Sequence, residues 1–270
     1  MSPSIGSGRP LLARWRRIPG PPRDATKARL LRLYTALERR YGAQSWWPGR
    51  SSYEIAAGAV LVQFTAWRGA AAALRALRVR GLLSPARLAA ATERDVAHAV
   101  RPSGTFRQKA QRLRAFTQWL VDRFQGRFEG MRRAPLGPLR QDLLRVHGIG
   151  PETADAILLY AAGRPVFVAD EYARRVLARH RLIAPRAGYE TIRAFVEAHL
   201  PSDPALFREY HALLVAVGRE HCGTIARCEG CPLRFDLPPG STAERPTARG
   251  RRGGARRRGP PGRGRDRPSP

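Results

Sequence analysis

The chain has 270 residues, a formal net charge of +28 at pH 7 and 43% hydrophobic residues. It contains no apolar run long enough to cross a membrane, and residues 1–25 lack the continuous apolar segment of a signal peptide, so neither an integral membrane protein nor a secreted protein is expected. The positive charge predicts a polyanionic partner bound in a salt-sensitive way, with nucleic acid as the leading candidate and a ribosomal or membrane-surface partner as alternatives.

Both ends of the chain are rich in Pro, Gly and Arg. Residues 241–270 contain ten Arg against two acidic residues and almost no apolar side chain. Because such segments cannot bury a core, we expect residues 1–25 and 241–270 to be disordered. The basic tail either adds nonspecific phosphate contacts or has no role. The residues between the ends suffice for one large or two small domains.

Almost every segment between the ends shows the apolar spacing of helices, and alternating strand patterns are scarce. Helix-start signals recur: a Ser-Ser-Tyr-Glu capping box at Ser51, Ser84 before Pro85, and Thr92 three residues before Asp95. The expected helices cover residues 30–38, 51–67, a segment from 84, a segment from 92, 104–116 and 206–217. These patterns predict an all-α protein.

A helix, a tight hairpin and a second helix are predicted over residues 143–158. The run Gly148-Ile149-Gly150 interrupts the helical spacing, and Pro151-Glu152-Thr153 opens the next helix. Because glycines lack side chains, the hairpin can adopt φ above zero and bring its N–H groups close to a phosphate. An ordinary helix–helix turn is the alternative interpretation of the glycine pair.

Asp170 follows an apolar run that starts at Val166 and precedes a helical pattern that resumes at Tyr172. It therefore occupies the position of an N-cap, where a carboxylate accepts hydrogen bonds from free backbone N–H groups. A purely structural cap is one interpretation. The other is compatible with it, because a cap is also a fixed, ionised carboxylate directed at whatever the hairpin binds.

The pattern Leu-x-x-x-x-Gly-Ile-Gly-x-x-Thr-Ala followed by Val-x-Asp resembles the helix-hairpin-helix DNA glycosylases of the endonuclease III superfamily. The resemblance extends from about Tyr34 to Leu237. It implies a two-domain fold for residues 27–237, with a DNA-binding cleft between the domains. Residues 53–163 would form the central domain with the hairpin, and residues 27–50 with 170–237 the second.

The resemblance also implies roles for single residues. Gly148, Ile149, Gly150 and Thr153 would bind DNA, and Asp170 would be essential for breaking the N-glycosidic bond. Members that also cut the DNA backbone carry a lysine where this chain has Glu152, and a carboxylate cannot form the imine that this reaction needs. The resemblance therefore implies a monofunctional enzyme, in which water captures the sugar.

The Trp46-Trp47-Pro48 element and Trp67 resemble the lesion pocket of the 3-methyladenine DNA glycosylases within this superfamily. A purine methylated at N3 or N7 is cationic and gains about 0.5–2 kcal/mol by stacking on an indole. The alternative is that these tryptophans are core residues.

Two further residues inherit candidate contacts with DNA from the resemblance. The Gln63-x-Thr65 pair resembles the segment in which a glutamine fills the gap left by the flipped base. Lys109 resembles a position near the DNA backbone, where it would contact a phosphate.

Cys222, Cys228 and Cys231 are the only cysteines, and they fall where many relatives hold a [4Fe–4S] cluster. Such a cluster needs four thiolates, and the expected fourth position near Leu237 is not cysteine. Asp236, His221 or an exogenous ligand could complete the set, zinc with three cysteines and a histidine is chemically allowed, or the site is degenerate.

The leading interpretation is a base-excision-repair glycosylase that acts as a monomer on double-stranded DNA with a damaged base. One alternative is a bifunctional glycosylase and AP lyase for oxidised pyrimidines, which would need another lysine as nucleophile. The other is a noncatalytic helix-hairpin-helix protein in which Asp170 is dispensable. Three cysteines without a pairing framework suit a reducing compartment, so we expect a cytoplasmic location on the nucleoid.

Overall fold

The computed structural model describes residues 25–44, 47 and 49–238. The helices are α2 (Ala25–Tyr41), α3 (Ser52–Leu61), α4 (Trp67–Val79), α5 (Pro85–Ala90), α6 (Glu93–Val100), α7 (Phe106–Phe124), α8 (Phe128–Arg133), α9 (Leu136–Leu144), α10 (Pro151–Ala156), α11 (Glu171–Arg179), α12 (Tyr189–His199) and α13 (Pro204–Glu220), with short helical turns η1 (Arg101–Ser103), η2 (Ile157–Ala161) and η3 (Arg234–Asp236). Within these ranges no strand forms, and the predicted all-α class is confirmed.

The expected disordered ends lie outside the described residues, apart from Ala25. In the described part of the chain, no helix combines the length and the apolarity that crossing a membrane requires.

Several helices start at a capping side chain that the sequence predicts. Ser84 and Thr92 cap α5 and α6, where their side chains accept hydrogen bonds from backbone N–H groups of the first turn. Asp170 caps α11 in the same way. The expected starts of these helices are therefore confirmed.

The helix expected over residues 51–67 is wrong in its last part. α3 ends at Leu61, and α4 starts only at Trp67. Between them Thr65 N donates to Val62 O at 3.1 Å, and Phe64 takes a left-handed φ of +53°. The loop contains neither glycine nor proline, so the usual stop signals are missing from the sequence.

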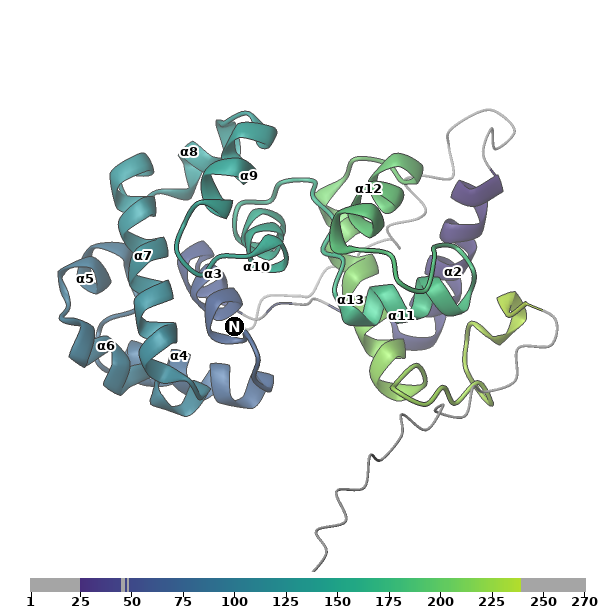
Figure 1. The fold of residues 1–270 in the computed structure, drawn as a ribbon, viewed down its shortest axis with the longest axis horizontal. Helices are drawn as coiled ribbons and strands as arrows, with labels where there is room; N and C mark the ends of the chain where they lie inside the picture. The colour runs from purple at the N-terminus through teal and green to yellow at the C-terminus, as the bar shows by residue number, and fades with distance from the viewer. Residues whose placement is uncertain (1–24, 45–46, 48, 239–270) are drawn as a thin grey trace, which may run out of the picture.

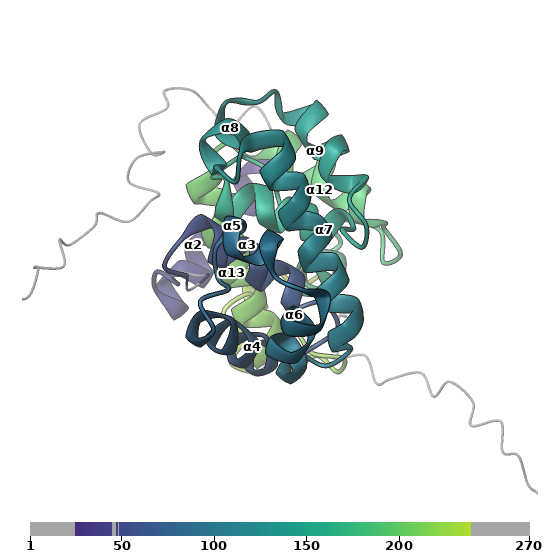
Figure 2. The ribbon, with the colours of Figure 1, turned by 90° about the vertical axis from the view of Figure 1, so that its left-hand side faces the viewer.

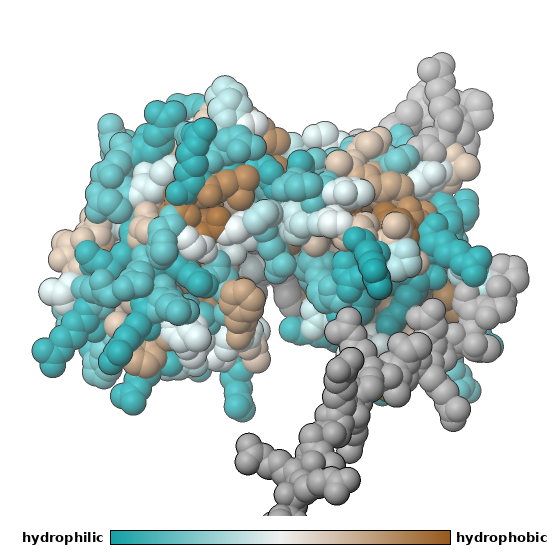
Figure 3. All heavy atoms as spheres, in the orientation of Figure 1, coloured by the Kyte–Doolittle hydropathy of each residue, from teal (hydrophilic) through white to brown (hydrophobic). Residues whose placement is uncertain are grey.

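The helices form two lobes, seen side by side in Figure 1 and one behind the other in Figure 2. One lobe contains α3 to α10. The other contains α11, α12 and α13, and α2 from the start of the chain packs against α13 there. The turn η2 contacts both α3 and α13, so it lies where the lobes meet. Hydrophilic side chains predominate on the face in Figure 3, which also shows a notch between the lobes.

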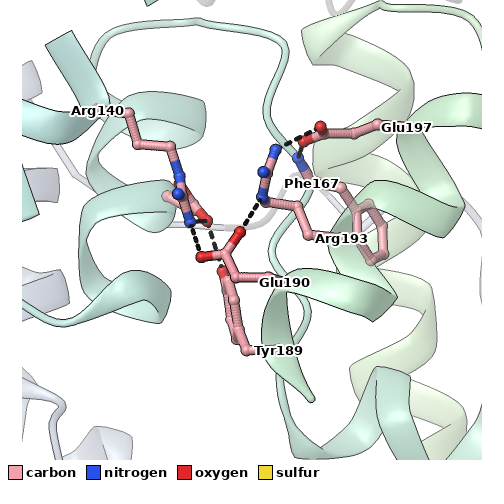
Figure 4. A network of polar contacts seen from close by, with 7 residues as sticks. Arg140, Phe167, Tyr189, Glu190, Arg193 and Glu197 are labelled. Atoms are coloured by element: carbon pink, nitrogen blue, oxygen red, sulfur yellow. Dashed lines mark hydrogen bonds and ion pairs between the residues drawn. The ribbon is translucent and has the colours of Figure 1, made fainter. Parts of the chain in front are cut away.

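A buried polar network joins the hairpin helices to the second lobe (Figure 4). Arg140 on α9 binds both carboxylate oxygens of Asp155 on α10, at 2.7 and 2.9 Å. The same guanidinium donates to Glu190 of α12 at 2.6 Å, and the Tyr189 hydroxyl donates to Asp155 at 2.9 Å. Burial raises the pKa of Asp155, while Arg140 opposes that shift. Since Asp155 is fully buried, its charge depends on these partners.

The network continues to the segment that carries Asp170. Arg193 binds Glu190 and Glu197 on its own helix, and a Glu197 oxygen accepts a hydrogen bond from Phe167 N at 2.9 Å (Figure 4). Phe167 is fully buried and lies three residues before Asp170. The hairpin and the Asp170 segment are therefore tied to the same helix.

Candidate active site

A cavity of about 590 Å³ lies between the α3–α4 loop, α10, the Asp170 segment and α13. Its wall is largely apolar, with a few convergent polar groups, which is the usual character of a small-molecule site. Its lining residues include Trp47, Gln63, Phe64, Trp67, Glu152, Thr153, Asp170, Tyr172 and His211. The structure thus brings together residues as far apart in the chain as Trp47 and Arg219.

Asp170 is held from two sides at this wall. Its Oδ1 accepts a hydrogen bond from Ala173 N at 2.8 Å, in the first turn of α11. Its Oδ2 lies 3.3 Å from His211 Nε2, and the side chain is 13% exposed. The carboxylate is therefore fixed, mostly shielded from water, and still part of the cavity surface.

His211 and Tyr160 are site residues that the sequence interpretation missed. His211 Nδ1 lies 2.6 Å from the Tyr160 hydroxyl. Because a carboxylate faces Nε2, the tautomer with its proton on Nε2 is favoured, and Nδ1 then accepts from Tyr160. Nε2 has no hydrogen bond of good geometry within the described residues, so its contact with Asp170 is electrostatic. The sequence feature that could have indicated His211 is its position within the apolar face of the helix expected over residues 206–217.

Glu152 lies at the rim shared by the cavity and the neighbouring groove. Its side chain is partly open to solvent. Burial, and secondly the nearby Asp170 carboxylate, raise the pKa of Glu152. The position that would carry an amine in a lyase therefore holds a second acid.

Aromatic rings form one wall of the cavity. The rings of Trp47 and Trp67 pack edge to face, with 5.8 Å between their centroids. The centroids of the Trp47 and Tyr160 rings are 5.0 Å apart. Both tryptophans are partly buried against the core and also line the cavity. Their role in binding a damaged base stays a prediction. Trp46 and Pro48 lie outside the described residues.

The hairpin borders a second groove of about 690 Å³, lined by Gly148, Ile149 and Gly150. Gly148 has φ +75°, and a Cβ there would overlap the side chain of Arg112. Gly150 has an ordinary φ of −89°, and a Cβ there would meet nothing within 4 Å. Of the two hairpin glycines, only Gly148 therefore has the positive φ that glycine adopts without strain. Ile149 is 4% exposed and anchors the hairpin in the core.

Gln63 is hydrogen-bonded to this hairpin. Its Nε2 donates to Gly148 O at 3.0 Å and to Thr153 Oγ1 at 2.8 Å, and its Oε1 accepts from Arg112 at 2.7 Å. The predicted insertion of Gln63 into DNA would require breaking these bonds. In this conformation the amide joins the α3–α4 loop to the hairpin.

The phosphate contact predicted for Lys109 is wrong for this structure. Lys109 is 1% exposed, and its Nζ donates to Leu61 O at 2.8 Å and to Ser103 O at 2.5 Å. Burial, with a smaller contribution from Arg112, lowers its pKa to about 8. Lys109 instead binds the C-terminal end of α3 and supports the loop that follows it.

The three cysteines border a hollow of about 20 Å³, roughly the volume of one water molecule. Cys222 Sγ accepts a hydrogen bond from Arg179 at 3.0 Å, and burial raises the pKa of Cys231. Leu237 lies near the position where the fourth cysteine was expected. Within the described residues, no three His, Cys, Asp or Glu side chains have a metal-binding arrangement.

The two substitute ligands considered for that fourth position have other partners. Asp236 binds Arg29 through both carboxylate oxygens at 2.8 Å and contacts His180 at 3.0 Å. His221 Nδ1 lies 3.0 Å from Arg227 O, whereas its Nε2 has no hydrogen-bond partner among the described residues and lies 3.5 Å from Glu220 Oε1. As placed, the described side chains here form no metal-binding group, and no step of the chemistry proposed below passes through a metal or cluster.

A two-lobed helical fold, a glycine hairpin and an N-cap aspartate in a cavity beside it define the helix-hairpin-helix DNA glycosylase class. The family model of the HhH-GPD superfamily base excision DNA repair protein matches residues 57–202. The chain belongs to this superfamily.

Individual relatives agree with this assignment. The chain is 36% identical over 207 residues to MJ1434 of Methanocaldococcus jannaschii, a protein assigned by inference to the DNA repair glycosylases, and the match covers 76% of this chain and 94% of that protein. The 3-methyladenine DNA glycosylase of H. pylori (MagIII), solved with 1,N6-ethenoadenine, has 26% identity and a TM-score of 0.61 over 72% of this chain and 97% of its own. A non-covalent complex of endonuclease III with DNA has 19% identity and a TM-score of 0.66, covering 79% and 96%, and shows a shared fold.

Proposed function

We propose that this protein is a monofunctional DNA glycosylase that releases alkylated purines from duplex DNA, with Asp170 as the catalytic carboxylate. The observation that carries the proposal is the position of Asp170. One oxygen is fixed by the α11 cap, and the carboxylate lies in the wall of an aromatic-lined cavity beside the hairpin. The high positive charge of the chain supports DNA as the substrate.

The proposed reaction is hydrolysis at the sugar C1′. As the N-glycosidic bond breaks, its electron pair leaves with the base, and positive charge develops on the sugar. The shielded Asp170 carboxylate stabilises that charge and accepts a proton from the attacking water, whose oxygen forms the new bond to C1′. A purine alkylated at N3 or N7 is cationic in DNA and departs as a neutral base, so the reaction needs no strong general acid.

Lysine content supports the monofunctional part of the proposal. The position that holds the reactive lysine in a lyase is Glu152 in this chain. The whole sequence contains two lysines, Lys27 and Lys109. Neither lines the cavity, and Lys109 is buried on backbone carbonyls. Schiff-base formation requires an amine that can reach C1′, and the cavity walls offer no lysine.

The cavity wall supports an alkylated purine as the substrate. Trp47 and Trp67 present indole rings, which attract cationic purines by about 0.5–2 kcal/mol. The H. pylori relative holds an alkylated adenine derivative, 1,N6-ethenoadenine, in its solved structure.

The test uses duplexes that each carry one defined lesion: 7-methylguanine, 3-methyladenine, 1,N6-ethenoadenine, 8-oxoguanine or thymine glycol. Free base and strand breaks are assayed separately, with and without borohydride. The variants are Asp170→Asn and, as a matched control, Asp203→Asn. Asp203 is also a helix-capping aspartate, at the start of α13, and it is not among the residues that line the cavity.

We expect the wild-type protein and Asp203→Asn to release the alkylated purines and leave intact strands with abasic sites. Asp170→Asn should lose roughly 100-fold or more of the rate while it still binds DNA. A borohydride-trapped adduct would favour the bifunctional alternative. Undiminished binding with no base release from any duplex would favour the noncatalytic one.

A further inference from the structure

Phe64 is the most exposed large apolar side chain in the described part of the chain, with 95% of its surface accessible. It lies in the α3–α4 loop and takes a left-handed φ of +53°, which L-residues rarely adopt. The unfavourable backbone angle costs stability, and the exposed phenyl ring contributes none, because it is not removed from water. This combination at a cavity entrance suggests that the ring contacts another molecule and not the rest of this protein.

The ring lies between the two hollows of the candidate site. Phe64 lines both the cavity that contains Asp170 and the groove of the Gly148–Gly150 hairpin. If a flipped base enters the cavity while the hairpin binds the neighbouring backbone, the gap in the base stack falls between these two places.

The loop that carries Phe64 is held firmly by the residues just before that position, and Thr65 N, just after it, donates to Val62 O at 3.1 Å. Lys109 Nζ binds Leu61 O at 2.8 Å, and the Gln63 amide binds Gly148 O and Thr153 Oγ1 of the hairpin. These bonds fix the loop, so the ring projects from a rigid base. They also occupy the Gln63 side chain that was first expected to enter the duplex.

We infer that Phe64 is the side chain that inserts into the duplex where the target nucleotide leaves the stack. This inference rests on the proposed function. A planar apolar ring stacks on the bases that border the gap and stabilises the extruded state. Gln63 then acts as the hydrogen-bonded support that aims the neighbouring ring.

One test measures insertion without any catalysis. Each protein is bound to a duplex with a tetrahydrofuran abasic-site analogue next to 2-aminopurine, whose fluorescence falls on stacking. The variants are Phe64→Ala, Phe64→Trp and the matched control Phe235→Ala, which removes a ring that is 60% exposed elsewhere. We expect quenched 2-aminopurine with the wild-type protein, Phe235→Ala and Phe64→Trp, and brighter fluorescence with Phe64→Ala.

A second test uses single-turnover base release from a paired lesion and from the same lesion in an unpaired bubble. Phe64→Ala should lose roughly 10- to 100-fold on the paired duplex and little in the bubble, where no extrusion is needed. Since the ring is exposed, thermal unfolding should be unchanged.

Equal fluorescence and equal paired-duplex rates for Phe64→Ala and wild type would overturn the inference and leave the proposed function intact. A wild-type protein that releases no base would overturn the proposed function, while the fluorescence test would still decide whether Phe64 inserts. A self-association that Phe64→Ala abolishes, without a fluorescence effect, would assign the ring to contact with a second copy of the chain and overturn the inference.

Discussion

His211 Nε2 lies 3.3 Å from Asp170 Oδ2, although 41 residues separate the two in the chain. Tyr160 holds the opposite ring nitrogen of His211 at 2.6 Å. Together with the Ala173 N–H on Oδ1, this contact leaves the Asp170 carboxylate little freedom to rotate. His211 therefore acts as a positioning residue for Asp170.

Replacing His211 by Ala should slow base release by roughly 10- to 100-fold, because a catalytic group displaced by about 1 Å loses rate on that order. DNA affinity should be nearly unchanged. Tyr160→Phe removes only the hydroxyl behind the ring and should have a smaller effect. Single-turnover rates and binding isotherms give the comparison, with the exposed His98→Ala as control. A rate for His211→Ala equal to that of the control would show that the α11 cap alone positions Asp170.

The two hairpin glycines should respond differently to alanine. Gly148→Ala introduces a Cβ at φ +75° that overlaps Arg112, so it should destabilise the protein by about 1–2 kcal/mol or more. Gly150→Ala should leave stability unchanged, since its φ is ordinary and its Cβ would meet no protein atom within 4 Å. If a phosphate occupies that open space, Gly150→Ala should weaken DNA binding. Denaturant unfolding and binding to an abasic duplex separate the two effects, and equal stability losses would contradict the geometry.

Removing Arg140 should destabilise the protein strongly. Arg140→Ala leaves the fully buried Asp155 without its main partner, and breaking a buried pair in this way costs about 3–5 kcal/mol. The exposed pair between Arg123 and Asp142 is a suitable control, because Arg123→Ala should cost about 0–1 kcal/mol. Urea unfolding of both variants measures the difference. A cost for Arg140→Ala near that of Arg123→Ala would mean that Asp155 is neutral in the folded protein.

The buried Lys109 should make the free energy of unfolding depend on pH. Its pKa is about 8 in the folded protein against an ordinary value of 10.5. Between these two values the unfolded chain binds more protons than the folded one, so stability rises with pH in this window. Below it, the buried charge costs the folded state an amount on the order of 1–3 kcal/mol.

The stability difference between the wild-type protein and Lys109→Met isolates this effect, because methionine does not titrate. Lys109→Met should be less stable overall, since Leu61 O and Ser103 O lose a donor. The difference should grow in favour of the wild type from about pH 8 to about pH 10.5. A constant difference across this range would show that Lys109 keeps its ordinary pKa.

The sequence by itself determined the features that depend on a few neighbouring residues. Ser84, Thr92 and Asp170 cap the helices that follow them, because a capping side chain reaches only the backbone N–H groups of the next turn. The left-handed turn at Gly148 was likewise expected from glycine chemistry. Asp170 was found as a candidate because its capping position lies within a short pattern shared with a known family.

Only the tertiary structure decided which distant groups meet at the site. The α3–α4 loop ends a helix without a local stop signal, since Lys109 and the hairpin bind it from outside. The same packing buries Lys109, exposes Phe64 and places His211 behind Asp170. Such contacts join side chains from separate helices, so they follow from how the two lobes pack and not from the spacing of residues along the chain.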